Sequence, residues 1–510
     1  MASVRSLENA LQIIGDPGTC DANGDVAFNP YLIPANGRII QNIIHGCDTV
    51  MSHITHLYHL SALDFINTST FPGMGPWLPS YTASDMIDGS STLGTTLVVH
   101  YVEALAMRRK MHTAGALFSG RQPIQNAMVP GGVSTMFSTT YPLSPSSTQH
   151  YDLFGPFNAA DTTSKFTALL KDVRTWINTT YLPDVITVAN AFPAYWSQGI
   201  GTTNVLAYGD FPVNSSGTLF LKRGAVQVLT RTTFNAANIA EYVDYSWYRY
   251  GILDPAALPP FSGKTEPTKA VSGYSWLKAP RLMNGTTAVV YEVGPLARVV
   301  ATHASATQVT VTDADTFATG ALSATNVRVG AGYNMTNLVT QALAYVSQPV
   351  GSVYSALGRH AARALEAKYL ADALAAWVTQ LTPNAPCYTY HRIPKQISAG
   401  AGLAEAPRGA LGHWIKIEGR KVAKYQCVVP STWNFSPRDG QNNPGPVEAC
   451  LIGSTIGTNA TNQIVNILRL VHPWDCCIAC AVHVVSPEGK EKLRFAIGPD
   501  GRPAKIEIAE

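Results

Sequence analysis

Apolar residues recur at helical spacing in three long segments of the chain. Between about residues 36 and 66, isoleucine, valine and leucine follow one another mostly three or four positions apart, which is the spacing of one helix face. Segments at about 92–118 and 354–381 have the same pattern, and the third places Leu357 and Trp377 on or near one face. Because these helices are long for a globular protein, the pattern predicts a central helix bundle.

Strand-like patterns occupy shorter segments. Residues 217–234 and 288–301 are rich in β-branched and aromatic side chains, and residues 413–430 are typical of a hairpin with Glu418, Gly419 and Arg420 at its turn. The predicted fold class is therefore predominantly α with smaller β regions (α+β), arranged around a long central helix bundle.

Composition narrows the range of functions. The chain has 510 residues, of which 46% are hydrophobic and 14% charged, with a net charge of +3. The low charge indicates that much surface is hidden inside the fold or against a partner subunit. No block of like charges favours nucleic acid. The sequence has no run of eighteen apolar residues, so we expect no membrane span. The N-terminus does not resemble a signal peptide.

A cluster of cysteines near the C-terminus carries the clearest candidate chemistry. Cys477 and Cys480 form a C-x-x-C pair after Asp475 and Cys476, and His483 follows at the same step. Two thiolates at this spacing can bind one soft metal such as zinc, iron or nickel. Spacing alone also allows a redox dithiol, half of a zinc site or two buried cysteines. The sequence contains no second C-x-x-C pair.

The cluster resembles the second cysteine motif of [NiFe]-hydrogenase large subunits, D-P-C-x-x-C-x-x-H, with Cys476 in place of the usual proline. Further segments resemble landmarks of that family in the right order over nearly the whole chain. They are SVRSLENAL, HITHLYHLSALDF, YSWLKAPR, EVGPLAR, EAPRGALGHW and YQCVVPSTWN. The resemblance is to the membrane-associated, H2-uptake type.

This resemblance implies the large subunit of an enzyme that cleaves H2 reversibly into protons and electrons. Its cofactor is a Ni–Fe centre whose iron carries carbon monoxide and cyanide, held by two bridging cysteines and two that bind nickel only. By position, Cys477 corresponds to a terminal nickel ligand and Cys480 to a bridging ligand. Electrons would pass to an iron–sulfur small subunit.

The resemblance also assigns residues around the metals. Arg408 corresponds to an arginine over their open side, and Asp475 would pair with it or steer it, so both are expected catalytic residues with Cys477. Pro430 and Ser431 correspond to residues that line the diatomic ligands. Without the resemblance, Arg408 would be interpreted as a surface ion pair, and the other two as an ordinary turn.

A magnesium-type ion is implied as well. Its expected ligands are His483 and the main-chain carbonyl of Cys427, since a carbonyl oxygen suits a hard cation. His53, His56 and His59 invite another metal interpretation, but the third drifts off the helix face, so we expect packed, hydrogen-bonded histidines.

Several positions depart from the family pattern. The first cysteine motif precedes SVRSLENAL, where this sequence has Met1, so two of the four metal thiolates are not among these residues. We expect the reading frame to extend upstream and to contain C-x-x-C. Ser52 stands where the family has an aspartate, and Pro123 where it has a histidine.

The alternative to a catalytic hydrogenase subunit is a non-catalytic homologue that acts as a scaffold and binds a partner. A zinc or dithiol protein is disfavoured, because neither needs EAPRGALGHW and VVPSTWN.

The domain organisation follows from the same comparison. Residues 1–483 form the expected large-subunit domain, and residues 484–510 resemble an extension that a dedicated protease removes after His483. The charged tail would be costly to bury; the alternative is a permanent surface strand or helix. Implied partners include this protease and metal chaperones besides the small subunit. The expected location is the periplasmic side of the cell membrane, with export alongside the small subunit and membrane contact only through partners; the cytoplasm is the alternative.

Overall fold

The structure is a computed structural model. It describes residues 1–11, 33–67, 70, 83–139, 159–250, 257–261, 265–268, 273–313, 332–389, 397–457, 460–476, 483–485, 491–497 and 503–505. The chain divides into two compact units, Met1–Trp474 and Asp475–Glu510.

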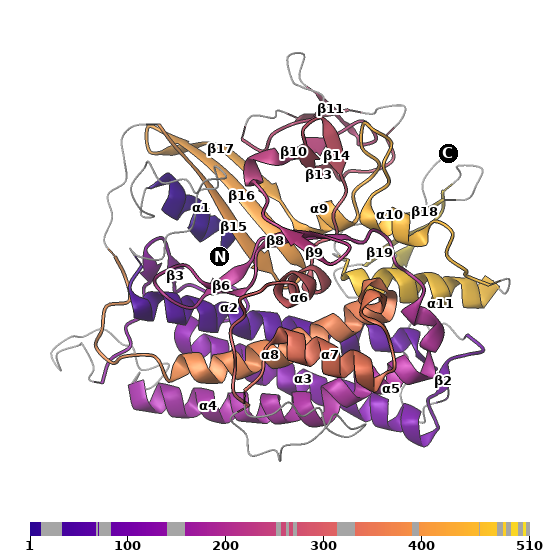
Figure 1. Cartoon of the computed structure of the whole chain (residues 1–510), viewed down its shortest axis with the longest axis horizontal. Helices are drawn as coiled ribbons and strands as arrows, with labels where there is room; N and C mark the ends of the chain where they lie inside the picture. The colour runs from indigo at the N-terminus through magenta and orange to yellow at the C-terminus, as the bar shows by residue number, and fades with distance from the viewer. Residues whose placement is uncertain are drawn as a thin grey trace. The chain divides into compact units, whose positions relative to one another are not determined.

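Four long helices lie side by side as a bundle along one side of the first unit (Figure 1). They are α2 (Ala35–Thr55), α3 (Thr92–Ser119), α4 (Ala159–Trp176) and α8 (Ala356–Val378). α2 packs against both α3 and α8, while α4 also contacts both of these helices. The three helices predicted from apolar spacing are confirmed to within a few residues, and the pattern missed α4.

The starts of two bundle helices follow from serine caps. The Oγ of Ser91 accepts the amide of Gly94 at the start of α3, and the Oγ of Ser355 accepts the amide of Gly358 at the start of α8, both at 3.0 Å. Such caps satisfy amides that have no carbonyl partner in the first helical turn. α2 continues without a break into a π-helical turn, η1 (His56–Ser61), and a 3₁₀ turn, η2 (Ala62–Asp64).

Shorter helices surround the bundle. They are α1 (Ala2–Ala10), α5 (Leu182–Ala191), α6 (Pro295–His303), α7 (Met335–Tyr345), α9 (Pro430–Asn434), α10 (Pro446–Leu451), α11 (Ala460–Val471), η4 (Ile177–Tyr181), η5 (Pro193–Trp196), η6 (Ala236–Asn238), η7 (Val350–Tyr354) and η8 (His472–Trp474). The strand predicted over 288–301 is wrong in its second half, which forms α6. Pro295 suits the first position of a helix and follows Gly294, whose φ of 134° breaks the extended segment.

The largest sheet is antiparallel and consists of β15 (Ser398–Ala406), β16 (Gly409–Glu418) and β17 (Lys421–Val428). Gly419 and Arg420 join the last two strands with φ values of 54° and 62°, which matches the twist that a two-residue hairpin needs. The predicted hairpin is therefore confirmed.

Smaller sheets complete the first unit. They are β1 (Ile66–Asn67) with β2 (Ile87–Asp88), β3 (Met128–Val129) with β4 (Gly132–Val133), β5 (Asn204–Ala207) with β8 (Gly224–Gln227) and β9 (Thr230–Thr232), β6 (Asp210–Pro212) with β7 (Leu219–Leu221), β10 (Ile239–Tyr242) with β13 (Ala279–Asn284) and β14 (Thr287–Val289), and β11 (Tyr248–Tyr250) with β12 (Thr265–Pro267). The predicted segment 217–234 contains β7, β8 and β9. The second unit holds one sheet of β18 (His483–Val485), β19 (Glu491–Ile497) and β20 (Pro503–Lys505).

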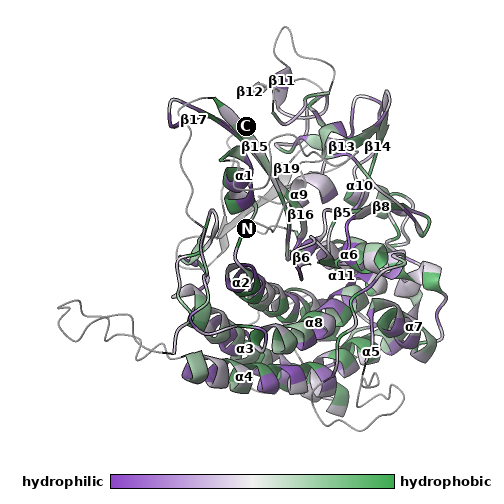
Figure 2. Ribbon diagram, turned by 60° about the vertical axis from the view of Figure 1, so that its left-hand side comes forward, coloured by the Kyte–Doolittle hydropathy of each residue, from purple (hydrophilic) through white to green (hydrophobic). Residues whose placement is uncertain are grey.

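The core of the first unit extends through the helix bundle. Figure 2 shows that the bundle helices carry hydrophobic residues alternating with hydrophilic ones, and the apolar members pack into one large cluster. A second cluster lies around Trp414 and Trp433, between the largest sheet and its neighbours. Helices with smaller sheets confirm the predicted fold class. Within the described part of the chain, no helix combines the length and apolar character needed to cross a membrane.

Candidate functional site

The buried guanidinium of Arg298, on α6, is the centre of the candidate site. Its Nε donates to both carboxylate oxygens of Glu366, at 2.9 and 3.1 Å, and one terminal nitrogen donates to Glu405 at 3.0 Å. All three side chains are almost fully buried. Removing Arg298 would leave the buried carboxylates without this counter-charge, which is strongly destabilising.

Arg298 also fixes the turn that carries Arg408. Its terminal nitrogens donate to the carbonyl oxygens of Ala406 and Pro407, each at 2.9 Å. Gly409, with a φ of 137°, follows Arg408, and a Cβ there would lie 2.7 Å from the amide nitrogen of Gly294. The turn between β15 and β16 is therefore held from below by α6, while the Arg408 side chain is exposed.

A second buried ion pair supports Glu405 from the other side. Asp210 accepts from Arg5 at 2.5 Å and from the amide of Glu405 at 2.8 Å. His45 lies 2.7 Å from the carbonyl oxygen of Glu405. Burial opposes ionisation of Asp210, but Arg5 and His45 outweigh it and hold its pKa below the ordinary value. Burial raises the pKa of Glu405 to about 7, against the attraction of Arg298.

α9 brings Pro430 and Ser431 toward the same place. Pro430 is buried and opens the helix, and Ser431 is half-buried. The Asn434 side chain accepts from the amide of Val293 at 2.9 Å and donates to its carbonyl at 2.8 Å. Since Val293 directly precedes Gly294, the segment before α6 connects α9 with the Arg408 turn.

The three helix histidines do not form a metal site. His56 Nε2 lies 2.8 Å from the carbonyl of His472, and His59 Nε2 lies 3.1 Å from that of Tyr101. Neither ring nitrogen of His53 has a hydrogen-bond partner among the described residues. No group of three or more histidine, cysteine or acidic side chains in that part of the chain could hold a metal ion. The expectation of packed histidines is confirmed, but hydrogen bonding fails for His53.

The remaining predicted site residues belong to other segments. Cys477 and Cys480 lie outside the described residues. His483 begins β18 in the second unit, and only its backbone is described. Asp475 opens that unit with a φ of 56°, and Cys427 is an exposed residue of β17, opposite His413. Their predicted roles therefore stay predictions.

Arg298 and Glu366 were missed at the sequence level, although an indication was present. Both charges interrupt apolar stretches, PLARVVA and RALEAKYL, and a charge on a buried helix face is almost never left without a partner. That argument predicts a paired charge but does not identify the pairing.

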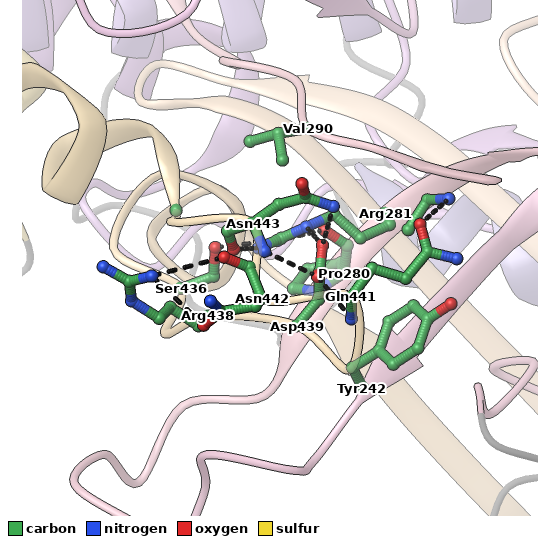
Figure 3. A network of polar contacts seen from close by, with 12 residues as sticks. Tyr242, Pro280, Arg281, Val290, Ser436, Arg438, Asp439, Gln441, Asn442 and Asn443 are labelled. Carbon is green, nitrogen blue, oxygen red and sulfur yellow. Dashed lines mark hydrogen bonds and ion pairs between the residues drawn. The ribbon is translucent and has the colours of Figure 1, made fainter.

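A further polar network anchors the chain after α9 (Figure 3). Arg281, fully buried on β13, donates to Asp439 at 2.7 Å and to the Ser436 hydroxyl at 2.9 Å. It also donates to the carbonyls of Pro280 and Pro437. The loop that follows Pro430 and Ser431 is thereby fixed to β13.

Sequence comparison defines the class of protein to which this fold and this arrangement belong. A family profile matches residues 25–71 and 69–483 of this chain, and that family is described as "Nickel-dependent hydrogenase". The chain belongs to this family, as its motifs predicted, and it is a hydrogenase large subunit, an oxidoreductase that acts on H2.

Particular relatives agree with this assignment. The periplasmic [NiFeSe] hydrogenase large subunit of Desulfomicrobium baculatum is 31% identical over 473 residues, covering 90% of this chain and 81% of the relative. The uptake hydrogenase large subunit of Bradyrhizobium diazoefficiens is 30% identical, with 98% and 86% covered. Among solved structures, the reduced Ni-Fe-Se hydrogenase from D. vulgaris Hildenborough matches with a TM-score of 0.73 and 28% identity, covering 94% of this chain and 85% of that one.

Proposed function

We propose that this chain binds a Ni–Fe centre through Cys477, as a nickel ligand, and Cys480, as a bridging ligand, and that Arg408 acts on H2 beside it. The observation that carries the proposal is the turn before Arg408, which Arg298 holds at two consecutive carbonyls. A family arginine that must lie over the metals needs such a fixed support, because the geometry of a catalytic group has to be held closely.

The donor chemistry fits half of such a centre. Cys477 and Cys480 are soft ligands suited to nickel and iron, and residues 1–510 contain no second C-x-x-C pair. Pro430 and Ser431 would line the diatomic ligands, and the hydroxyl of Ser431 would donate to a cyanide nitrogen. When bound, the centre would supply heterolytic cleavage of H2 and accept its electrons.

Arg408 would provide a fixed positive charge, steered by Asp475. Arg408→Lys should leave nickel content near normal and lower H2 oxidation by about two to three orders of magnitude, by analogy with removal of other transition-state donors. Lysine is a flexible point charge and cannot reproduce a planar fork. Arg420→Lys, in the exposed hairpin turn, is the matched control.

Two outcomes separate the alternatives. Unchanged turnover in Arg408→Lys, at full nickel content, would remove Arg408 from the site. A wild-type heterodimer without nickel and without H2 turnover would favour the scaffold homologue, for which metal analysis of the purified complex is the direct measurement.

A magnesium-type ion would bind between His483 and the Cys427 carbonyl. Oxygen ligands and an imidazole suit a hard divalent cation better than the thiol of Cys427 does. One equivalent of magnesium that disappears in His483→Ala, with nickel retained, would support this site; equal magnesium in both forms would exclude it.

Assembly follows from the family. Large-subunit relatives imply a small-subunit partner, and the periplasmic and uptake relatives indicate periplasmic association. We propose further that the partner carries iron–sulfur clusters, that export occurs with it on the periplasmic side of the membrane, and that metal chaperones load the centre. Cell fractionation with both subunits tagged would detect a cytoplasmic complex instead.

We also propose that residues 484–510 are removed by a maturation protease. Support comes from the family match, which ends at residue 483, and from the charged residues of the tail, which resist burial. Intact-mass measurement of the nickel-loaded protein decides between a terminus at His483 and one at Glu510.

A further inference from the structure

Three buried histidines of the first unit have ring nitrogens without a hydrogen-bond partner among the described residues. His53, His56 and His360 are almost fully buried. Among the described residues, neither ring nitrogen of His53 or of His360 has a partner, and Nδ1 of His56 has none. Buried polar atoms without partners are rare in folded proteins, and ordered water usually satisfies those that occur. We therefore expect internal water at these ring nitrogens.

The rings are held in their neutral form. Burial lowers the pKa of His53, and it lowers those of His56 and His360 well below the ordinary value. Arg363 acts in the same direction on all three rings. A neutral imidazole presents one donor and one acceptor nitrogen, so it can take up a proton on one side and release one from the other.

One end of this histidine cluster reaches the support of Arg408. His53 Nε2 lies 3.5 Å from Glu366, and Glu366 is bound by Arg298. Arg298 in turn donates to the Pro407 carbonyl, one residue before Arg408. The cluster therefore begins beside the proposed H2-cleaving site.

The middle of the cluster is continuous. His53 and His56 stand three residues apart where α2 passes into η1, which brings them to neighbouring positions on the helix. The ring centroids of His56 and His360 are 5.5 Å apart. This separation places the two rings against each other, so a water that joins them would lie beside the pair and contact one nitrogen of each ring.

The other end approaches solvent. His56 Nε2 lies 2.8 Å from the His472 carbonyl, and His472 Nδ1 lies 2.6 Å from Asp64. The His472 side chain is 19% exposed, whereas the Asp64 side chain is 6% exposed. Arg469 joins the Asp64 carbonyl to Asp85, whose side chain is 50% exposed.

We propose that His53 and His360, with water at their free nitrogens, carry protons from Glu366 to the ring of the His472–Asp64 pair. His56 positions this water through Nδ1, because its Nε2 donates to the His472 carbonyl, which cannot pass on a proton. The inference rests on the proposed function, in which each H2 yields two protons and two electrons. In each hop one ring nitrogen gains a proton and the other loses one, so the ring gains no net charge; rotation of the ring then restores its starting tautomer.

The charges around the histidine cluster favour passing a proton on rather than holding it on a ring. Arg298, Arg359 and Arg363 raise the cost of an imidazolium near the cluster, while Glu366 is the acid that faces His53. A metal ion does not explain the three rings, since no described group of ligands could hold one.

His360→Phe in the nickel-loaded heterodimer tests the proposal. His360 makes no hydrogen bond with a described residue, so an aromatic replacement removes the relay with little other loss. With H2 in D2O, formation of HD requires proton exchange with solvent, whereas conversion of para- to ortho-hydrogen requires only cleavage and recombination. HD formation should fall about ten-fold or more, the usual scale for loss of a proton-transfer group, while para–ortho conversion stays near the wild-type rate.

His59→Phe is the matched control. It lies on the same π-helical turn but contacts the Tyr101 carbonyl rather than the cluster, so both rates should stay unchanged. If His360→Phe loses nickel, His53→Phe replaces it in the same comparison, because both ring nitrogens of His53 also lack a partner among the described residues. A wild-type ratio of the two rates in a nickel-loaded cluster variant would overturn the proposal.

A second measurement does not depend on turnover. In the full chain labelled with ¹⁵N-histidine, the resonances missing from His53→Phe and His360→Phe identify the two rings. We expect neutral shifts and exchange with water. Rings sealed from water would overturn the proposal even in an active enzyme. Absence of H2 cleavage in nickel-loaded wild type, with the rings in contact with water, would instead overturn the proposed function.

Discussion

The stability of this molecule depends on individual buried charges, and the contribution of an ion pair depends on how far its surroundings exclude water. Arg281 and Asp439 are both fully buried in their pair, whereas Arg249 and Glu266, also an arginine–carboxylate pair, are 66% and 43% exposed. Water screens the second pair but not the first, so the same ionic contact has different consequences at the two places.

Arg281→Ala should therefore lower the free energy of unfolding by about 3–5 kcal/mol, because Asp439 is left charged and buried. Arg249→Ala should change it by less than about 1 kcal/mol. Denaturant unfolding of the two variants beside wild type measures both values. Losses of equal size would show that the Arg281 network contributes no more than a surface pair.

The sequence indicated Arg408 but not what supports it. EAPRGALGHW pointed to Arg408 by resemblance, and its role stays a prediction, whereas Arg298 lies more than a hundred residues away in the sequence. This support arises only when α6 packs beneath the turn, and local pattern carries no information on such a long-range contact.

At the scale of elements, helices with regular apolar spacing were predictable and irregular ones were not. α2, α3 and α8 follow the spacing closely, whereas α6 was predicted as a strand because its β-branched residues favour extended structure. The packing of α1 was also not apparent from the sequence. It lies against β15 at Gly400 and Gly402, where the two backbones approach closely.

Gly402→Ala should separate α1 from β15. A Cβ at Gly402 would overlap the carbonyl oxygen of Ala2 and the amide nitrogen of Ser6, and backbone atoms cannot move aside cheaply. We expect a loss of about 1–3 kcal/mol in the free energy of unfolding and faster amide exchange confined to α1. Gly351→Ala, with no atom within 4 Å of its Cβ, should leave both unchanged. Protected α1 amides in Gly402→Ala would contradict this account.

Across the whole first unit, a few buried carboxylates join segments that are distant in sequence. Glu8 on α1 accepts the amide of Gly131 at 3.0 Å, in the turn between β3 and β4. Its second oxygen has no partner among the described residues, and burial raises its pKa to about 7. Glu8 is therefore protonated in the folded chain at pH values where the unfolded chain has lost the proton.

Stability should consequently fall as the pH rises through about 7. The folded state binds the extra proton between about pH 4.5 and 7, so the contribution of Glu8 is complete below this window and lost above it. The loss amounts to about 3 kcal/mol if the whole difference in pKa is expressed. Glu8→Gln should remove this part of the pH dependence. Parallel stability curves for the two proteins between pH 4.5 and 8 would show that Glu8 does not titrate in this way.

The π-helical turn η1 has a consequence for comparing this chain with its relatives. A π turn accommodates one residue more than an α turn, so deleting a residue between His56 and Ser61 would leave a regular helix. Later side chains would keep their orientation around the axis, because the π turn absorbs the extra residue, and Asp64 would still reach the imidazole of His472. A one-residue alignment gap at this turn is thus compatible with the same packing on both sides, and residues beyond it correspond by orientation although their numbering shifts by one.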